Sequence, residues 1–182
     1  MSAPVVIVGV CGSIAAYKAA EIVSTLVKRE CEVHVVMSPG AQKFITPLTF
    51  HTLSRNPVLT EHDAATGNWK PAHIDLADRA QLLLIAPATA NILAQLACGL
   101  ASHPLCEIAL ATLAPVLIAP AMNGKMWQHP ATRGNVATLK ARGVEFIGPE
   151  EGLLACGYEG IGRLWKVDEV VERAITLLSR ET

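Results

Sequence analysis

The first regular pattern in the chain reads Val5-Val6-Ile7-Val8 and continues into Gly9-Val10-Cys11-Gly12-Ser13. An unbroken β-branched run of this kind is typical of a parallel strand that is buried on both faces of a sheet. A helical periodicity extends from Ile14 to Arg29, directly after the glycine-containing turn. Strand, tight turn and helix together form the repeating unit of an α/β protein.

Buried-strand patterns recur along the chain and alternate with helical ones. Strands are predicted at residues 32–37, 82–86, 116–119 and 144–147, and helices at 91–100, 104–113, 131–142 and 167–180. The segment 41–53 is expected to hold a short helix and a loop. Because helices separate the strands, the pattern predicts an α/β fold with a doubly wound parallel sheet and right-handed crossovers. No repeat or convincing linker interrupts it, so residues 1–182 are expected to form one domain.

Composition excludes several classes of function. The 182 residues are 51% hydrophobic and only 17% charged, and the net charge is -1 without a basic block, which argues against a nucleic-acid or anionic-membrane partner. No apolar run reaches the ~18 residues that span a bilayer. The N-terminus has no basic region before its apolar stretch, so it is interpreted as a core strand and not as a signal peptide.

The five cysteines are odd in number, scattered and without a CxxC pair. This spacing argues against a disulfide framework or a zinc site and favours a reducing, cytoplasmic location. No metal is expected. The high apolar content and the polar segment 56–71, predicted to be a mobile or partner-contacting loop, suggest that copies of the chain assemble.

Ligands of a doubly wound sheet bind beyond the carboxyl ends of its strands. Four segments follow predicted strands in this chain, namely 9–14, 38–41, 87–91 and 120–127. They contain most of the Gly, Ser, Thr, Asn and Pro residues that do not fit a core. The sequence therefore predicts one site built from four loops.

The first two loops have the composition of a phosphate site. Gly12 would let the backbone approach a ligand, and Ser13 with the amides that open the helix could hold a phosphate. The third glycine of the dinucleotide fingerprint is missing, and a hydroxyl at Ser38 suits a phosphate better than a ribose diol. Ordinary turn and N-cap chemistry explains these residues equally well.

The segments Pro87-Ala-Thr-Ala-Asn91 and Pro120-Ala-Met-Asn-Gly-Lys-Met-Trp127 each offer small residues, an amide and accessible backbone. A flat ring could lie against such loops. Asn91 is explained better as a strand-end N-cap. Asn123 could orient a carboxylate, because its neighbours Met122, Met126 and Trp127 suggest an apolar cleft wall.

Two further residues are candidates for chemistry. A lone histidine such as His73 is more often structural than catalytic, although an imidazole suits a general base. Cys156 lies in the glycine-rich segment 154–163, which is interpreted as a flexible flap. A cysteine there could act as a redox group or proton donor, and the same glycines also fit a plain loop.

The chain resembles the homo-oligomeric flavin-containing cysteine decarboxylases over nearly its whole length. The resemblance rests on six segments that occur in the family's order. They are Gly12-Ser-Ile-Ala-Ala-Tyr-Lys18, Thr46-Pro-Leu-Thr-Phe50, His73-Ile-Asp-Leu76, Pro87-Ala-Thr-Ala-Asn91, Pro120-Ala-Met-Asn-Gly-Lys-Met-Trp127 and Ala155-Cys-Gly157 with Gly162-Arg163. Each segment alone is weak evidence of a resemblance, but all six in the family's order, with the Pro-Ala-Met-Asn motif intact, are strong evidence. The family includes phosphopantothenoylcysteine decarboxylase of coenzyme A synthesis and enzymes that modify C-terminal cysteines of ribosomal peptides.

The resemblance implies a Rossmann-like, three-layer fold of the flavodoxin type that binds FMN. It places the FMN phosphate near Gly12, Ser13, Ile14 and Ser38. It places the isoalloxazine along residues 88–91, with Ala121 close by. In this segment the implied flavin contacts are Ala88, Thr89, Ala90 and Asn91.

The resemblance also implies the catalytic roles. His73 matches the family histidine, which acts as the base and faces the flavin of a neighbouring subunit. Asn123 matches the residue that binds the cysteine carboxylate, and Cys156 matches a cysteine that helps to reduce the intermediate. Met126 and Gly157 are expected to join Asn123 and Cys156 around the substrate. The expected assembly is a trimer or a multiple of it, with a dodecamer favoured.

The implied reaction makes chemical sense. A cysteine carboxylate does not leave easily as CO2, because the carbanion has nowhere to place its charge. Oxidation of the Cβ–SH group to a thioaldehyde, with two electrons passing to FMN, creates a sulfur analogue of a β-keto acid. Loss of CO2 then gives a delocalised enethiolate.

Three departures bear on the substrate. Asp78 stands where the coenzyme A enzymes usually carry Lys or Arg, Ser102-His103 stands where the family usually has an Asp followed by Asn or Asp near the flavin, and Tyr158 replaces a common Asp. They favour a peptide ending in cysteine slightly, whereas the retained Cys156 favours phosphopantothenoylcysteine. A non-catalytic FMN-binding regulatory relative, and a redox or prenyl-transfer flavoprotein, are less favoured because His73 and the 120–127 motif are intact.

Overall fold

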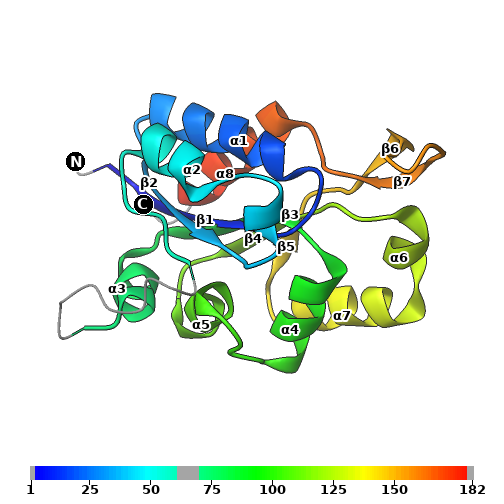
Figure 1. The fold of residues 1–182 in the computed structure, drawn as a ribbon. Coiled ribbons are helices and arrows are strands. Elements are labelled where there is room, and N and C mark those ends of the chain that lie inside the picture. The colour runs from blue at the N-terminus through cyan, green and yellow to red at the C-terminus, as the bar shows by residue number, and fades with distance from the viewer. Residues whose placement is uncertain (1–2, 61–69, 180–182) are drawn as a thin grey trace.

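The computed structural model describes residues 3–60 and 70–179. In this part of the chain, five strands form one parallel sheet in the order β2-β1-β3-β4-β5 (Figure 1). This is the strand order of flavodoxin-like, doubly wound proteins. The strands are β1 (Val5–Val10), β2 (Glu32–Met37), β3 (Leu82–Ala88), β4 (Val116–Pro120) and β5 (Glu145–Phe146).

Helices cover both faces of the sheet, which gives three layers (Figure 1). One face carries α1 (Ala16–Lys28), α2 (Pro47–Ser54) and α8 (Val167–Leu178). The other carries α3 (Ala72–Arg79), α4 (Ala90–Cys98), α5 (Pro104–Ala111) and α7 (Pro130–Ala141). A 3-10 turn, η1 (Ala41–Lys43), follows β2. Beyond the sheet lie α6 (Gly124–Gln128) and the antiparallel hairpin of β6 (Glu150–Leu153) and β7 (Glu159–Arg163). The predicted fold class is confirmed.

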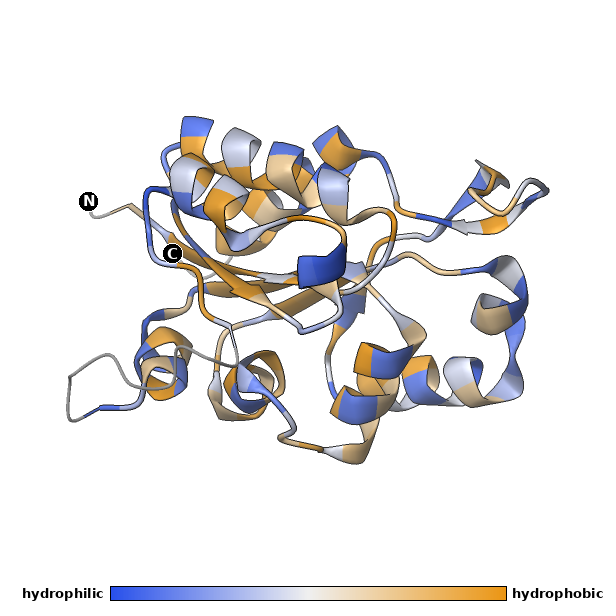
Figure 2. Ribbon diagram, viewed as in Figure 1, coloured by the Kyte–Doolittle hydropathy of each residue, from blue (hydrophilic) through white to orange (hydrophobic). Residues whose placement is uncertain are grey.

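Successive strand residues bury themselves on opposite faces of the sheet. In β1, Val6 and Val8 join the apolar cluster under α1 and α8, whereas Ile7 joins the cluster on the side of α4 and α5. Figure 2 shows the central strands as mainly hydrophobic and the outward helix faces as mixed. Burial on both faces is the physical reason why the strand sequences are continuous apolar runs.

Backbone hydrogen bonds join the loops at the carboxyl edge. The Ser38 N–H donates to the Val10 carbonyl at 2.9 Å, and the Cys11 N–H donates to the Pro87 carbonyl at 3.2 Å. The Ala121 N–H donates to the Ala88 carbonyl at 2.9 Å. These bonds tie the ends of β1, β2, β3 and β4 into one rim.

The predicted strands and helices are present, with boundaries that differ by a few residues. The strand predicted at 144–147 is limited to Glu145–Phe146, and the first helix starts at Ala16 and not at Ile14. The sequence did not predict α3, α6 or the β6–β7 hairpin. Residues 61–69 of the predicted polar loop lie outside the described residues.

None of the helices described is both long and apolar enough to cross a membrane. In the same part of the chain, no group of three or more His, Cys, Asp or Glu side chains is placed to hold a metal ion.

Candidate functional site

A cavity of about 520 Å³ opens at the carboxyl edge of the sheet, and all four predicted loops contribute to it. Its volume lies within the ~300–1,000 Å³ of small-molecule and cofactor sites. The cavity is lined by Gly12, Ser13, Ser38, Pro39, Gly40, Thr89, Ala90, Asn91, Gln95, Ser102, His103, Ala121, Met122 and Met126. None of these lining residues is an Asp or Glu, so nothing in the lining would repel a phosphate.

At one end of this cavity, two backbone loops touch. A Cβ on Gly12 would lie 2.7 Å from the backbone carbon of Gly40, so a side chain at Gly12 cannot be accommodated. The hydroxyl oxygen of Ser13 accepts a hydrogen bond from the Ala15 N–H at 3.3 Å, and α1 begins at the next residue, Ala16. Hydroxyls of Ser13 and Ser38 beside the opening of a helix suit a phosphate.

The other end of the cavity is formed by β3, β4 and the start of α4. The Thr89 hydroxyl oxygen caps α4 by accepting from the Ile92 N–H at 3.4 Å. Thr89, Ala90, Asn91 and Ala121 line the cavity, as predicted for contacts with a flat ring. Ala88 is fully buried in the strand and lines neither cavity described here, so its contact with a flavin stays a prediction.

A buried thiol lies close to this cavity. Burial raises the pKa of Cys11 from 9.0 to about 12, against smaller opposing effects of hydrogen bonds with the Thr89 backbone and the Ser38 side chain. Cys11 is 1% exposed and is therefore a packing residue next to the site and not a nucleophile.

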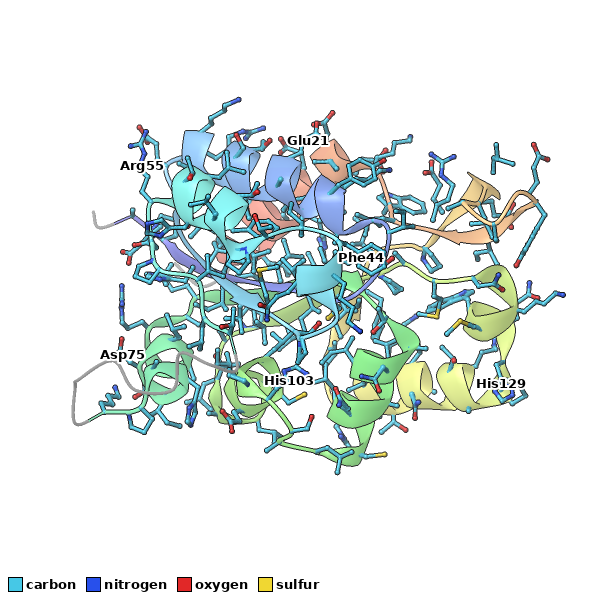
Figure 3. All side chains as sticks on the ribbon, in the orientation of Figure 1. Glu21, Phe44, Arg55, Asp75, His103 and His129 are labelled. Carbon is cyan, nitrogen blue, oxygen red and sulfur yellow. The ribbon has the colours of Figure 1, made fainter. Side chains whose placement is uncertain are left out.

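Three lining residues, Gln95, Ser102 and His103, lie outside the four predicted loops. The Gln95 side-chain amide donates to the Ser102 hydroxyl at 2.9 Å, and His103 is the N-cap residue of α5. Figure 3 labels His103 at the start of α5, on the face of the sheet that carries α4. The departure at Ser102-His103 was the sequence signal that could have placed them here.

A second cavity, of about 660 Å³, adjoins the first and shares Ser13, Ala121 and Met122 with it. Its remaining lining residues are Ile14, Ala15, Tyr17, Lys18, Asn123, Leu153, Leu154, Ala155, Cys156, Gly162, Arg163 and Leu164. Ile14, predicted near the phosphate, lies here and is 59% exposed. Met126 lines the first cavity, and Gly157 lines neither.

The second cavity brings together two of the three predicted catalytic side chains. Asn123 is the N-cap residue of α6, and its amide oxygen accepts from the Lys125 N–H at 2.9 Å. Its amide nitrogen donates to the Cys156 sulfur at 3.4 Å. The hairpin that carries Cys156 is attached to the β4 loop, because the Met122 N–H donates to the Gly162 carbonyl at 2.9 Å.

Two cationic side chains also reach the second cavity. Lys18 comes from α1 and Arg163 from the end of β7. Arg163 lies 3.8 Å from the Glu150 carboxylate, so its charge is only partly offset. No Asp or Glu is among the described residues that line this cavity.

The third predicted catalytic residue lies elsewhere in the same chain. His73 is on α3, and its Nδ1 is 3.3 Å from Oε2 of Glu107 on α5. It lines neither cavity, and its side chain is 30% exposed. A single chain therefore does not bring His73 to Asn123.

Comparison with known proteins places the chain in a family. The family model described as Flavoprotein matches residues 1–179. The chain belongs to this family. The flavoprotein is 45% identical over 177 residues to the coenzyme A biosynthesis bifunctional protein CoaBC of Bacillus subtilis, covering 97% of this chain and 44% of the relative. It thus spans less than half of that relative's length.

Other relatives match along their full length. The flavoprotein is 43% identical to a probable phosphopantothenoylcysteine decarboxylase of Streptococcus mutans, with 92% of this chain and 95% of the relative covered. A solved PPC decarboxylase mutant complexed with pantothenoylaminoethenethiol superimposes with a TM-score of 0.87 at 28% identity, covering 99% and 100% of the two chains. The FMN-dependent cysteine decarboxylase SpaF gives a TM-score of 0.85 at 29% identity, covering 98% of each chain. The expected resemblance and the expected flavin are confirmed at the level of the family.

Proposed function

We propose that this flavoprotein binds FMN in the first cavity and decarboxylates phosphopantothenoylcysteine in the second. The observation that carries the proposal is the 3.4 Å contact between the Asn123 amide nitrogen and the Cys156 sulfur, in a cavity that shares its wall with the first. A carboxylate-binding amide and a thiol thus lie together beside the flavin-sized space.

The first cavity supports FMN in particular. Its hydroxyls at Ser13 and Ser38 and the close approach of Gly12 to Gly40 suit a single terminal phosphate, and the lining lacks carboxylates. AtHal3, described as an FMN binding protein, has a TM-score of 0.85 and 28% identity over 98% of this chain.

Each side chain then has a part in the reaction. Asn123 donates its amide N–H groups to the substrate carboxylate, Cys156 lies beside the reacting sulfur, and His73 removes a proton. FMN, when bound, supplies an acceptor for the two electrons that leave the cysteine side chain. Return of these two electrons, with protons, to the enethiol leaves loss of CO2 as the net reaction.

The comparisons favour the coenzyme A substrate over the peptide substrate to which the sequence leaned slightly. Two structural features agree with them. Lys18 and Arg163 place positive charge on the second cavity, which suits a phosphorylated substrate. The Asp78 carboxylate, which stands where the coenzyme A enzymes usually carry Lys or Arg, lies 2.8 Å from the Lys70 ammonium, so its charge is offset.

His73 supports an assembly of several chains. Because it lies outside both cavities of its own chain, its proposed role requires that it reach the site of a neighbour. We therefore keep the trimer, or a multiple of it such as a dodecamer, as part of the proposal.

Mass spectrometry of the purified protein loaded with FMN tests the substrate. Incubation with phosphopantothenoylcysteine should remove about 44 Da, the mass of CO2, whereas an enethiol product from a peptide ending in cysteine would lose about 46 Da. Conversion of the peptide alone would establish the peptide substrate. Release of no CO2 from either compound would favour the non-catalytic FMN-binding relative.

A further inference from the structure

We propose that Tyr158 is a positioning residue that holds the Asn123 amide with its NH2 group toward the substrate carboxylate. This rests on the proposed function, because it assigns Asn123 the carboxylate of the substrate. It adds a residue from the hairpin to the site, and with it a reason why the hairpin lies against the β4 loop.

The hydrogen bonds around Asn123 fix which end of its amide faces the second cavity. The amide oxygen accepts from the Lys125 N–H at 2.9 Å and from the Tyr158 hydroxyl at 2.8 Å. Both lone pairs of the oxygen are then used. The NH2 group is left to point at the Cys156 sulfur, 3.4 Å away, where a substrate would lie.

The backbone bond from Lys125 alone would not hold this geometry. One hydrogen bond identifies the oxygen end of the amide but leaves rotation about the side-chain torsions, which are broad for asparagine. A second bond from a different element fixes the direction of the NH2 group. Because Tyr158 comes from the hairpin and Lys125 from α6, the two bonds approach the oxygen from separate parts of the chain.

Tyr158 is itself held in place. The Tyr158 carbonyl accepts from the Leu154 N–H at 2.9 Å, which closes the loop of the hairpin. A Cβ on Gly160 would lie 3.4 Å from the Tyr158 ring, and a Cβ on Gly124 would lie 3.6 Å from its hydroxyl. The phenol ring therefore lies against Gly160, and its hydroxyl lies near Gly124 and is directed at Asn123.

Close contact between two backbones sets this arrangement. A Cβ on Gly124 would lie 2.6 Å from the Ile161 carbonyl oxygen, and one on Gly162 would lie 2.1 Å from the Met122 carbonyl oxygen. The strand β7 can thus lie directly on residues 122–124 only because Gly124 and Gly162 lack side chains. The short distance brings the Tyr158 hydroxyl within reach of Asn123.

The test is Tyr158→Phe, which keeps the ring and removes only the hydroxyl. Two ligands are compared by calorimetric titration of the FMN-loaded protein. One is phosphopantothenoyl-S-methylcysteine, which keeps the carboxylate but has no free thiol, and the other is the same molecule with hydrogen in place of the carboxylate. We expect the variant to bind the carboxylate ligand about tenfold more weakly and the second ligand within about twofold of the wild type.

A double-mutant cycle separates positioning from a general effect on the hairpin. Asn123→Ser keeps an N-cap hydroxyl on α6 but removes the NH2 group. In that background, Tyr158→Phe should cause no further loss of affinity for the carboxylate ligand, because the group it positions is gone.

Three results would overturn the proposal. They are equal weakening of both ligands by Tyr158→Phe, unchanged affinity for both, or an undiminished effect in the Asn123→Ser background. Failure of the wild-type protein to bind either ligand would overturn the proposed function, and this proposal with it. That outcome is distinguishable, because it is read from the wild type alone.

Discussion

His73 and Glu107 form a pair whose geometry can be tested one residue at a time. The histidine Nδ1 lies 3.3 Å from the Glu107 carboxylate, and about a third of each side chain is exposed. A carboxylate beside Nδ1 can orient the imidazole, which leaves Nε2 for the proposed proton transfer. Glu107→Gln should therefore lower kcat about fivefold with little change in KM, since a positioning contact of this kind contributes about 1 kcal/mol.

The matched control for this prediction is Glu172→Gln. Glu172 also lies beside a basic side chain, that of Arg29, but this pair joins the end of α1 to α8, and neither residue lines a cavity. It should leave kcat and KM unchanged. Steady-state kinetics of both variants test this prediction, and their melting temperatures show whether each variant is folded. Wild-type kcat in Glu107→Gln would show that the contact is only structural.

Burial of the Cys11 thiol predicts how the free energy of unfolding depends on pH. Its pKa is raised by burial from 9.0 to about 12, so the folded protein keeps this proton where the unfolded chain loses it. The stabilising contribution is complete below pH 9 and declines as the pH rises from 9 towards 12. In Cys11→Ala, the loss of unfolding free energy between pH 7.5 and pH 10 should be smaller by about 1 kcal/mol. Urea titrations at both pH values measure it, and an identical loss in the two proteins would contradict the assignment.

At the scale of the elements, the placement of the β6–β7 hairpin depends on glycine. Gly162 has φ +143° and no room for a Cβ, whereas Gly134 in the exposed face of α7 has open space around it. Gly162→Ala should destabilise the protein by more than about 1 kcal/mol and weaken substrate binding, since the hairpin cannot lie on residues 122–124. Gly134→Ala should be neutral or stabilise by up to about 1 kcal/mol, because alanine is the better helix former. Thermal unfolding and substrate KM compare the two; destabilisation of equal size in both would refute the close-packing argument.

The contrast between predictable and unpredictable elements has a physical cause. The strands β1, β3 and β4 are buried on both faces, so their continuous apolar sequences identify them, and the loops after them identify the first cavity. The short helix α6 carries no such pattern, because it depends on the Asn123 cap. The hairpin depends on contacts with residues that precede it by about forty positions in the chain. Sequence reasoning therefore singled out Asn123 and Cys156 as candidates, but it could not predict the hydrogen bond from the Tyr158 hydroxyl to Asn123.

At the scale of the whole molecule, the face that holds His73 has the properties of a contact between copies. Leu110 lies one helical turn after Glu107 on α5 and is 55% exposed, and Leu113 just beyond the helix is fully exposed. Exposed leucines beside a partly exposed histidine suit burial against a second copy. Leu110→Lys should lower the sedimentation coefficient and the decarboxylase activity together. Loss of activity with unchanged sedimentation would contradict a role in assembly.

Assembly also predicts that two inactive variants can restore each other. Chains with His73→Asn lack the proposed base, and chains with Asn123→Ser lack the amide proposed to bind the carboxylate, so each assembly alone should be inactive. When the two chains are co-expressed with different tags and purified as mixed assemblies, a site that combines the His73 of one chain with the Asn123 of another has both groups. Random mixing should return about a quarter of the wild-type activity per site, because one pairing in four is intact. If His73 served the cavity of its own chain, every site in the mixture would lack one group, and the mixed assemblies would be as inactive as their parents.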